Sequence, residues 1–170
     1  MGELELRVPG EHNLKNALAA LAVGEILSIP FEVSQRALKR FVGAERRFQV
    51  LGEADGVTVI DDYAHHPTEV RATLETARKS YPGRRIVACF QPHTYSRTQY
   101  LLEGFKTCFE GLDALYILGT YAAREQADAG IDARGLAGAI TRPAPTYLET
   151  FEEATDRIAA ALEPGDVFFT

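Results

Sequence analysis

The sequence predicts an α/β fold in which a mostly parallel sheet is covered by helices on both faces. From about residue 47 onward, short apolar runs alternate with segments of helical periodicity, the pattern of a sheet built from strand–helix–strand units. Polar clusters directly follow three of the expected strands, at residues 61–66, 91–97 and 119–125. Parallel strands end at one edge of a sheet, and ligands bind at that edge, so we expect the three clusters to meet there.

Two helices are predicted before the sheet begins. Residues 11–27 are rich in Ala and Leu, and a second short helix is expected from Ser34, with Pro30 separating the two. The side chains expected to face inward are Leu14, Ala17, Leu18, Leu21 and Ala22 in the first helix and Ala37, Leu38 and Phe41 in the second. Residues 1–9 are short for an independent element, and we expect them to be the tail of a preceding unit.

A hairpin and a helix are predicted next. Residues 48–51 and 57–60 are apolar runs on either side of Asp55-Gly56, a strong hairpin signal. A helix over residues 67–80 opens at Pro67, a favoured residue for the first helical turn. Its inward face is expected to carry Val70, Leu74, Ala77 and Tyr81.

The remaining elements continue the alternation. Strands are expected at residues 86–90, 114–118, 146–148 and 166–169, with a helix near residues 133–140. Another helix is expected to be capped by Ser96, with Leu101, Phe105, Cys108, Phe109 and Leu112 inward. Thr150 and Glu153 form a capping-box pattern before a last helix with Ala154, Ile158, Ala161 and Leu162 inward. Because the chain stops at the end of a strand, we expect both ends to be truncated.

Composition narrows the class of protein. A chain of 170 residues suits one domain, or one domain with a fragment of another. The net charge of −6 and the lack of a basic run argue against a nucleic-acid partner. No apolar run approaches the roughly 20 residues of a membrane span, so the cytoplasm is the expected location. Cys89 and Cys108 lie in apolar surroundings, and we expect core thiols rather than a disulfide.

The turn that follows the 57–60 strand is the strongest candidate site. Asp61 and Asp62 could bind a sugar hydroxyl or a metal, and because strand residues alternate faces, one of the two is expected to be structural. His65 and His66 could serve as ligands, acid–base groups or substrate anchors, while one of them could instead cap the helix that begins at Pro67. A metal site made from these four side chains stays an alternative.

Other polar residues are weaker candidates. His93 precedes a helix whose first turn carries Arg97, where a cation opposes the helix dipole unless both face an anion. Asn13 and Asn16 share a helix face and could contact an adenine edge. Arg46 and Arg47 could hold a phosphate or be solvated, and Glu125 in the third cluster could face the site.

Taken together, these residues resemble the Mur ligases, the enzymes that build the peptidoglycan stem peptide. The matching segments are Gly10-x-His12-Asn13-x-x-Asn16, Arg46-Arg47-Phe48, Asp61-Asp62-Tyr63-Ala64-His65-His66-Pro67-Thr68-Glu69-Val70 and Phe90-Gln91-Pro92-His93-Thr94-Tyr95-Ser96-Arg97-Thr98. The last segment is most similar to the members that join L-alanine to UDP-N-acetylmuramate. The resemblance runs in order along nearly the whole chain.

The resemblance implies a place within a three-domain enzyme. Mur ligases have a UDP-sugar domain, a central ATPase domain and a C-terminal Rossmann-like domain that admits the amino acid. Residues 1–43 would then be a helical remnant of the central ATP-binding domain, and residues 44–170 the C-terminal domain, truncated at its end. The N-terminal and central domains would be missing from this chain.

The resemblance also implies roles for individual residues. Asn13 and Asn16 would contact adenine, Arg47 the ATP phosphate and Asp62 the ribose. An L-alanine pocket would be formed by Tyr63, His65, His93 and Arg97, with Arg97 holding the carboxylate. Some members carry a second Arg where this chain has Thr94. The implied cofactors are ATP and Mg²⁺, with the metal ligands mostly in the missing central domain and no metal site in this chain.

In the family reaction the muramoyl carboxylate and ATP form an acyl phosphate, which the amine of L-alanine attacks. The 170 residues contain no Gly-x-x-x-x-Gly-Lys-Ser/Thr phosphate loop, so we expect this polypeptide to be inactive alone. Three alternatives stay open. They are the related ligase that recycles murein peptide, a non-catalytic nucleotide-binding domain, and a metal hydrolase built on His65, His66 and Asp62.

Overall fold

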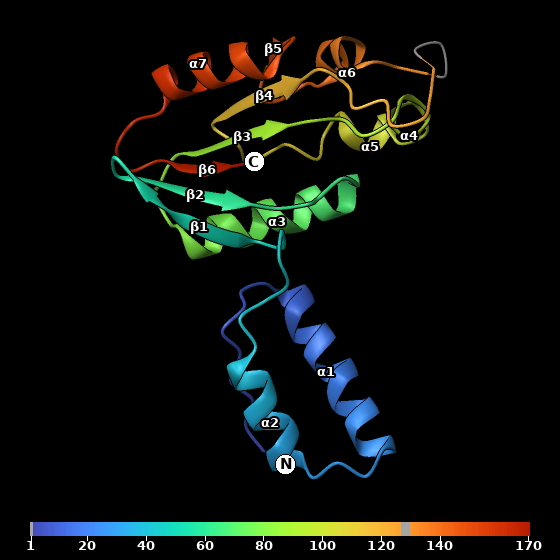
Figure 1. Ribbon diagram of the computed structural model, residues 1–170, viewed down its shortest axis with the longest axis vertical. Coiled ribbons are helices and arrows are strands. Elements are labelled where there is room, and N and C mark those ends of the chain that lie inside the picture. The colour runs from blue at the N-terminus through green and yellow to red at the C-terminus, as the bar shows by residue number, and fades with distance from the viewer. Residues whose placement is uncertain (1, 127–129) are drawn as a thin grey trace.

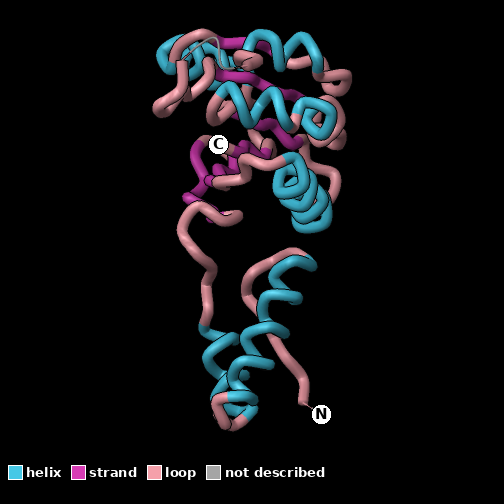
Figure 2. Tube along the Cα trace, turned by 90° about the vertical axis from the view of Figure 1, so that its right-hand side faces the viewer, coloured by secondary structure: helices cyan, strands magenta, loops and turns pink. Residues whose placement is uncertain are grey.

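The computed structural model describes residues 2–126 and 130–170, and it has two parts (Figure 1). A pair of helices, α1 (Glu11–Ile26) and α2 (Phe31–Arg40), lies at one end. The rest of the chain forms a unit of sheet and helices. Figure 2 shows the helix pair hanging below the sheet unit, joined to it by the extended segment between α2 and β1.

The sheet has the predicted, mostly parallel topology. Its strands are β1 (Gln49–Ala54), β2 (Val57–Asp61), β3 (Ile86–Phe90), β4 (Ala114–Leu118), β5 (Thr146–Leu148) and β6 (Val167–Phe169). They form a six-stranded sheet in the order β1-β2-β6-β3-β4-β5. Only the β1–β2 pair is antiparallel, and each of the other neighbouring pairs is parallel. The carboxyl ends of β2, β3, β4, β5 and β6 therefore share one edge.

Helices cover both faces, as predicted. The helices of the sheet unit are α3 (Pro67–Ser80), α4 (Tyr95–Tyr100), α5 (Leu102–Phe105), α6 (Ala133–Ala139) and α7 (Phe151–Ala161). Side chains from α3, α5 and α6 pack with Ile86, Ala88 and Phe90 in the main core. Leu118 and Leu148 pack instead with α7 in a smaller cluster on the other face. This division follows from strand geometry, because alternate side chains point to opposite faces.

The turn between β1 and β2 is the predicted Asp55-Gly56 hairpin. Both residues have positive φ, 50° and 78°, as the two-residue hairpin turn that matches strand twist requires. A Cβ added at Gly56 would lie 3.1 Å from the Cβ of Pro164. Glycine is therefore favoured here by both its backbone freedom and the space available.

The predicted inward faces of the two N-terminal helices are confirmed at Ala17 but wrong for most of the other side chains. Leu14 and Leu18 are 47% and 55% exposed, and within α1 only Ala17 and Gly24 are buried. The second helix begins at Phe31 rather than Ser34. It has no buried residue, and Ala37 and Phe41 are exposed while Leu38 is half-buried. The physical reason is that α1 and α2 pack mainly against each other, and two helices bury only the sides that face one another.

The predicted cap at Ser96 is also wrong. The helix begins at Tyr95, and the cap position is Thr94, two residues before Ser96, with a φ of 68°. It then breaks at Leu101 into α4 and α5. The Ser96 side chain is directed elsewhere, since its hydroxyl donates to Glu125. The predicted burial of Phe105, Cys108, Phe109 and Leu112 is confirmed.

The last helix begins where the pattern predicts, but its cap differs in one detail. Thr150 accepts a hydrogen bond from the amide of Glu153, as a capping box requires. The Glu153 carboxylate accepts from the amide of Glu149 rather than from that of Thr150. Among the described residues, no helix combines the length and apolar character needed to cross a membrane.

Candidate functional site

The three polar clusters meet at the carboxyl edge of the sheet, which confirms that prediction. They follow β2, β3 and β4, and two clefts open beside them. The first cleft, of about 730 Å³, lies between the helix pair and the start of α3. The second, of about 870 Å³, runs from the β2 turn past the loop after β3 to α7. Asp62 lines both clefts.

Asp62 is held by three hydrogen bonds from the protein itself. Its Oδ2 accepts from the amide of Phe48 at 3.1 Å and from the hydroxyl of Thr73 at 3.0 Å. Its Oδ1 accepts from the amide of Ala64 at 2.8 Å. Asp61 instead pairs with the Nε of Arg46 at 3.3 Å. Asp62 is therefore a structural residue as well as a wall of the site.

His66 caps α3, which confirms the expectation that one of the two histidines of the turn could cap this helix. The Nδ1 of His66 accepts from the amide of Thr68 at 3.2 Å. The carboxylate of Glu69 accepts from the amides of His65 and His66 at 3.0 and 3.2 Å. Burial tends to raise the pKa of Glu69, but these amides, His65 and Arg47 together lower it. Glu69 was not a candidate from sequence, although a Glu two residues after an opening Pro is a recognisable capping signal.

His65 lines the second cleft, and the turn itself holds one of its ring nitrogens. Its Nδ1 lies 2.8 Å from the carbonyl oxygen of Tyr63, and because a carbonyl only accepts, this nitrogen carries the hydrogen. The neutral ring then has a free lone pair on Nε2. The ring also packs against that of Tyr63, at 4.8 Å between centroids, and the Arg46 guanidinium lies 4.8 Å from the Tyr63 ring.

His93 has the opposite arrangement. Its Nδ1 lies 3.3 Å from Nη1 of Arg97, and because a guanidinium only donates, this nitrogen accepts. The hydrogen of the neutral ring is therefore on Nε2. The ring packs against Tyr121, with centroids 5.2 Å apart and planes 30° apart. His93 and His65 both line the second cleft.

The structure groups the predicted residues into two sets. Asn13, Asn16, Arg47 and Asp62 line the first cleft, and Tyr63, His65 and His93 line the second. Arg97 contacts the second set through His93 rather than forming part of the cleft wall.

Two of the predicted first-cleft residues already have partners in the chain. The Asn13 amide donates to the carbonyl of Pro9 at 2.6 Å. Arg47 lies 3.7 Å from Glu69. A ligand in this cleft would compete with both contacts.

The alternative metal site is not formed within the described residues. Across residues 2–126 and 130–170, no group of three or more His, Cys, Asp or Glu side chains is placed to hold a metal ion. The ring of His66 and the carboxylate of Asp62 bond to the protein backbone instead. The metal-hydrolase alternative therefore has no geometric support.

The two thiols differ in burial. Cys108 is buried in the main core, and burial raises its pKa to about 12. Cys89 is half-buried and lines the second cleft, and burial raises its pKa to about 11. Neither thiol is ionised at neutral pH, which makes both poor nucleophiles.

Comparison with known proteins identifies the family. The Mur ligase, glutamate ligase domain family matches residues 46–170. The chain belongs to the Mur ligase family. The UDP-N-acetylmuramate–L-alanine ligase of Desulforamulus reducens is 49% identical over 173 residues, covering 100% of this chain and 37% of that protein. This chain thus spans little more than a third of that Mur ligase.

Solved structures of Mur ligases share the fold. The UDP-N-acetylmuramate–alanine ligase of Thermotoga maritima is 28% identical, with a TM-score of 0.79, covering 99% of this chain and 36% of that one. A murein peptide ligase of Psychrobacter arcticus is 24% identical, with a TM-score of 0.70, covering 98% of this chain and 35% of that one. The second likeness concerns the fold alone. The family match begins at residue 46, and the assignment of residues 1–43 to a preceding domain stays a prediction.

Proposed function

We propose that this chain is the C-terminal part of an ATP-dependent ligase that joins L-alanine to UDP-N-acetylmuramate in peptidoglycan synthesis in the cytoplasm. The observation that carries the proposal is the pair of clefts that share Asp62. One contains the residues suited to a nucleotide, and the other contains those suited to an amino acid. The identity to the Desulforamulus reducens ligase over the whole of this chain supports the choice of reaction.

In the second cleft, the proposed L-alanine site has a donor end and an acceptor end. Arg97, which lies beside the cleft and bonds to His93, and the Nε2 hydrogen of His93 suit the carboxylate, since both donate hydrogen bonds. The Nε2 lone pair of His65 suits the ammonium group, with Tyr63 beside it. An α-amino acid would be oriented by these two ends, and an amine so oriented is placed to react.

In the first cleft, we assign Asn13 and Asn16 to adenine, Arg47 to phosphate and Asp62 to ribose. The amides of the two Asn side chains can both donate and accept, as an adenine edge requires. Arg47 supplies a fixed positive charge. Mg²⁺ would be held mostly by residues of the proposed central domain.

The proposed reaction has two steps. The muramoyl carboxylate takes the terminal phosphoryl group of ATP, giving an acyl phosphate and ADP. The ammonium group of L-alanine loses a proton, and the free amine nitrogen attacks the acyl carbon. The amide bond forms, phosphate leaves and the nitrogen loses its second proton. The residues of this chain orient the amine and its carboxylate, while ATP and its metal supply the activation.

The test uses the longer ligase that contains this chain. We expect ADP release to depend on both L-alanine and UDP-N-acetylmuramate. Arg97→Ala should raise the KM for L-alanine by about 10–100-fold, the loss of one charge-assisted contact, with the KM for ATP unchanged. Arg157→Ala, an exposed substitution on α7, is the matched control. Release of ADP without L-alanine dependence would refute the proposal.

Two further measurements separate the alternatives. Replacing L-alanine by a murein tripeptide should abolish turnover, and tripeptide-dependent turnover would favour the recycling ligase instead. The 170-residue chain by itself is expected to release no ADP. Titration calorimetry of this chain with ATP distinguishes a nucleotide-binding domain, which would give heat, from a half-site that binds only when the other domains are present.

A further inference from the structure

Gly119 and Tyr121, in the loop after β4, are bonded to the loop after β3. Gln91 Nε2 donates to the carbonyl of Gly119 at 2.9 Å. The amide of Tyr121 donates to the carbonyl of Pro92 at 2.9 Å, and the amide of Thr94 donates to the carbonyl of Tyr121 at 2.9 Å. These contacts make an isolated parallel bridge between His93 and Tyr121, beyond the ends of β3 and β4.

Glu125 completes this connection at the far end of the loop. One oxygen of its carboxylate accepts from the amide of Ser96 at 2.9 Å, and the other accepts from the Ser96 hydroxyl. The Ser96 hydroxyl and then its amide are the main causes that lower the pKa of Glu125. The carboxylate is thus ionised at neutral pH and bound to the first turn of α4.

The segment held in this way carries His93, which lines the second cleft, and Arg97, which bonds to His93. Ser96, which makes both contacts with Glu125, lies between these two residues in the sequence. Thr94 has a φ of 68°, a left-handed conformation that is unfavourable for a β-branched residue. Such a conformation persists only where surrounding contacts hold it.

We propose that Glu125 is a positioning residue for the amino-acid site, acting through Ser96 to keep His93 and Arg97 in the geometry that binds the substrate carboxylate. The inference rests on the proposed function. It assigns a role to the loop after β4, which that function leaves unused. Glu125 itself touches the first turn of α4 rather than the cleft, since it is not among the residues that line the cleft.

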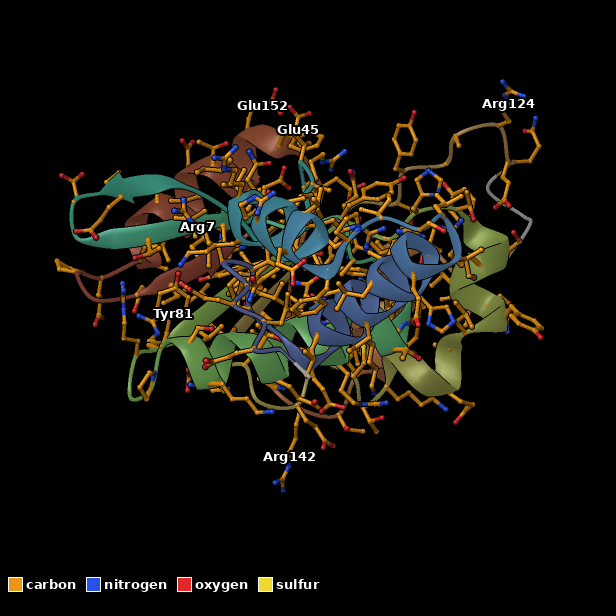
Figure 3. All side chains as sticks on the ribbon, turned by 90° about the horizontal axis from the view of Figure 1, so that it is seen from below. Arg7, Glu45, Tyr81, Arg124, Arg142 and Glu152 are labelled. Atoms are coloured by element: carbon orange, nitrogen blue, oxygen red, sulfur yellow. The ribbon has the colours of Figure 1, made fainter. Side chains whose placement is uncertain are left out.

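The kinetic test uses the longer ligase. Glu125→Ala removes both bonds to Ser96 and should raise the KM for L-alanine about tenfold, the fold-change that corresponds to one hydrogen bond to a charged group. The KM for ATP and UDP-N-acetylmuramate should stay unchanged. Glu125→Gln keeps an acceptor for the Ser96 amide and a donor for its hydroxyl, so it should recover most of the loss. Arg124→Ala is the matched control, because Arg124 is the neighbouring residue and projects away from the body of the protein (Figure 3).

A double substitution tests whether the effect passes through Ser96. If it does, Ser96→Ala combined with Glu125→Ala should raise the KM for L-alanine no further than Glu125→Ala does alone. Additive increases would overturn the proposal.

A second readout uses the 170-residue chain without any turnover. Amide hydrogen exchange at residues 93–97 should quicken in Glu125→Ala and stay at the wild-type rate in Arg124→Ala. Unchanged exchange in Glu125→Ala would overturn the proposal.

The experiments distinguish a failure of the inference about Glu125 from a failure of the proposed function. A wild-type ligase that is active with L-alanine, combined with an unchanged KM in Glu125→Ala, overturns the inference alone. A wild-type protein with no L-alanine-dependent ADP release overturns the proposed function, and the assignment of Glu125 to L-alanine binding falls with it.

Discussion

Replacing Asp62 with Ala should destabilise the sheet unit strongly, whatever ligand the residue binds. The substitution removes the acceptor of three hydrogen bonds, from Phe48, Thr73 and Ala64. Phe48 and Thr73 are buried, so water cannot readily replace the lost partner. Phe48 also has a φ of 48°, an unfavourable conformation for a bulky residue, and its amide bond to Asp62 helps to hold it.

The size of the effect follows from these contacts. A hydrogen bond to a charged group contributes about 1.5–3 kcal/mol, and the partial exposure of Asp62 reduces that value. We expect a total loss of about 3 kcal/mol, with the bonds from Phe48 and Thr73 dominating. In a chain of this size, about 1 kcal/mol lowers Tm by about 2–4 °C, so the expected decrease is about 6–12 °C.

The assay is thermal unfolding of the 170-residue chain followed by circular dichroism. Thr73→Val removes only one of the three bonds and should lower Tm by about 2–4 °C. Asp62→Asn keeps one oxygen acceptor, so its Tm should lie between those of Asp62→Ala and Thr73→Val. A Tm for Asp62→Ala within about 2 °C of wild type would refute the structural role. If the Tm is unchanged, a loss of ATP affinity in Asp62→Ala would come from the proposed ribose contact and not from destabilisation of the fold.

Two further predictions concern stability. Burial raises the pKa of Cys89 and Cys108 above the ordinary value of 9.0, so unfolded thiols ionise first and the free energy of unfolding should fall as pH rises from about 9 towards 11. Urea midpoints at pH 8 and 10 measure the fall, and a double Cys→Ala variant that shows the same fall would exclude the thiols as its cause. Gly56→Ala should destabilise by about 1 kcal/mol because of its positive φ and the nearby Pro164, whereas Gly138→Ala, in open space within α6, should not destabilise. Equal urea midpoints for these two variants would contradict the turn argument.

The sheet could be predicted from sequence because its signals are local. Apolar runs such as residues 86–90 and 114–118 are short, bounded by polar residues and separated by helical patterns, and all of them became strands. The meeting of the three polar clusters followed from topology, since parallel strands end at one edge. No information about distant contacts was needed for either conclusion.

The errors have a different cause, because each depends on a contact between residues distant in sequence. Ser96 looks like a helix cap, but Glu125 binds its side chain and amide, and no local pattern contains that information. The apolar residues of α1 predict an inward face, but burial depends on what packs against that face. Asp61 and Asp62 are adjacent and chemically alike, so only the position of Phe48 and Thr73 shows which one is held by the fold.

The two clefts share a wall at Asp62. This shared wall explains why the neighbouring residues Arg46 and Arg47 have different partners. Arg46 lines the second cleft and Arg47 the first, although they are neighbours in the chain. Arg46 reaches Asp61 and the Tyr63 ring, whereas Arg47 reaches Glu69 at the start of α3. A ligase of the proposed kind must bring a phosphate donor and an amine together from separate sites, which suits a wall with one Arg on each side. Because Asp62 anchors that wall to Phe48 and Thr73, we infer that its structural bonds and its proposed ribose contact serve one purpose, which is to hold the two sites at a fixed separation.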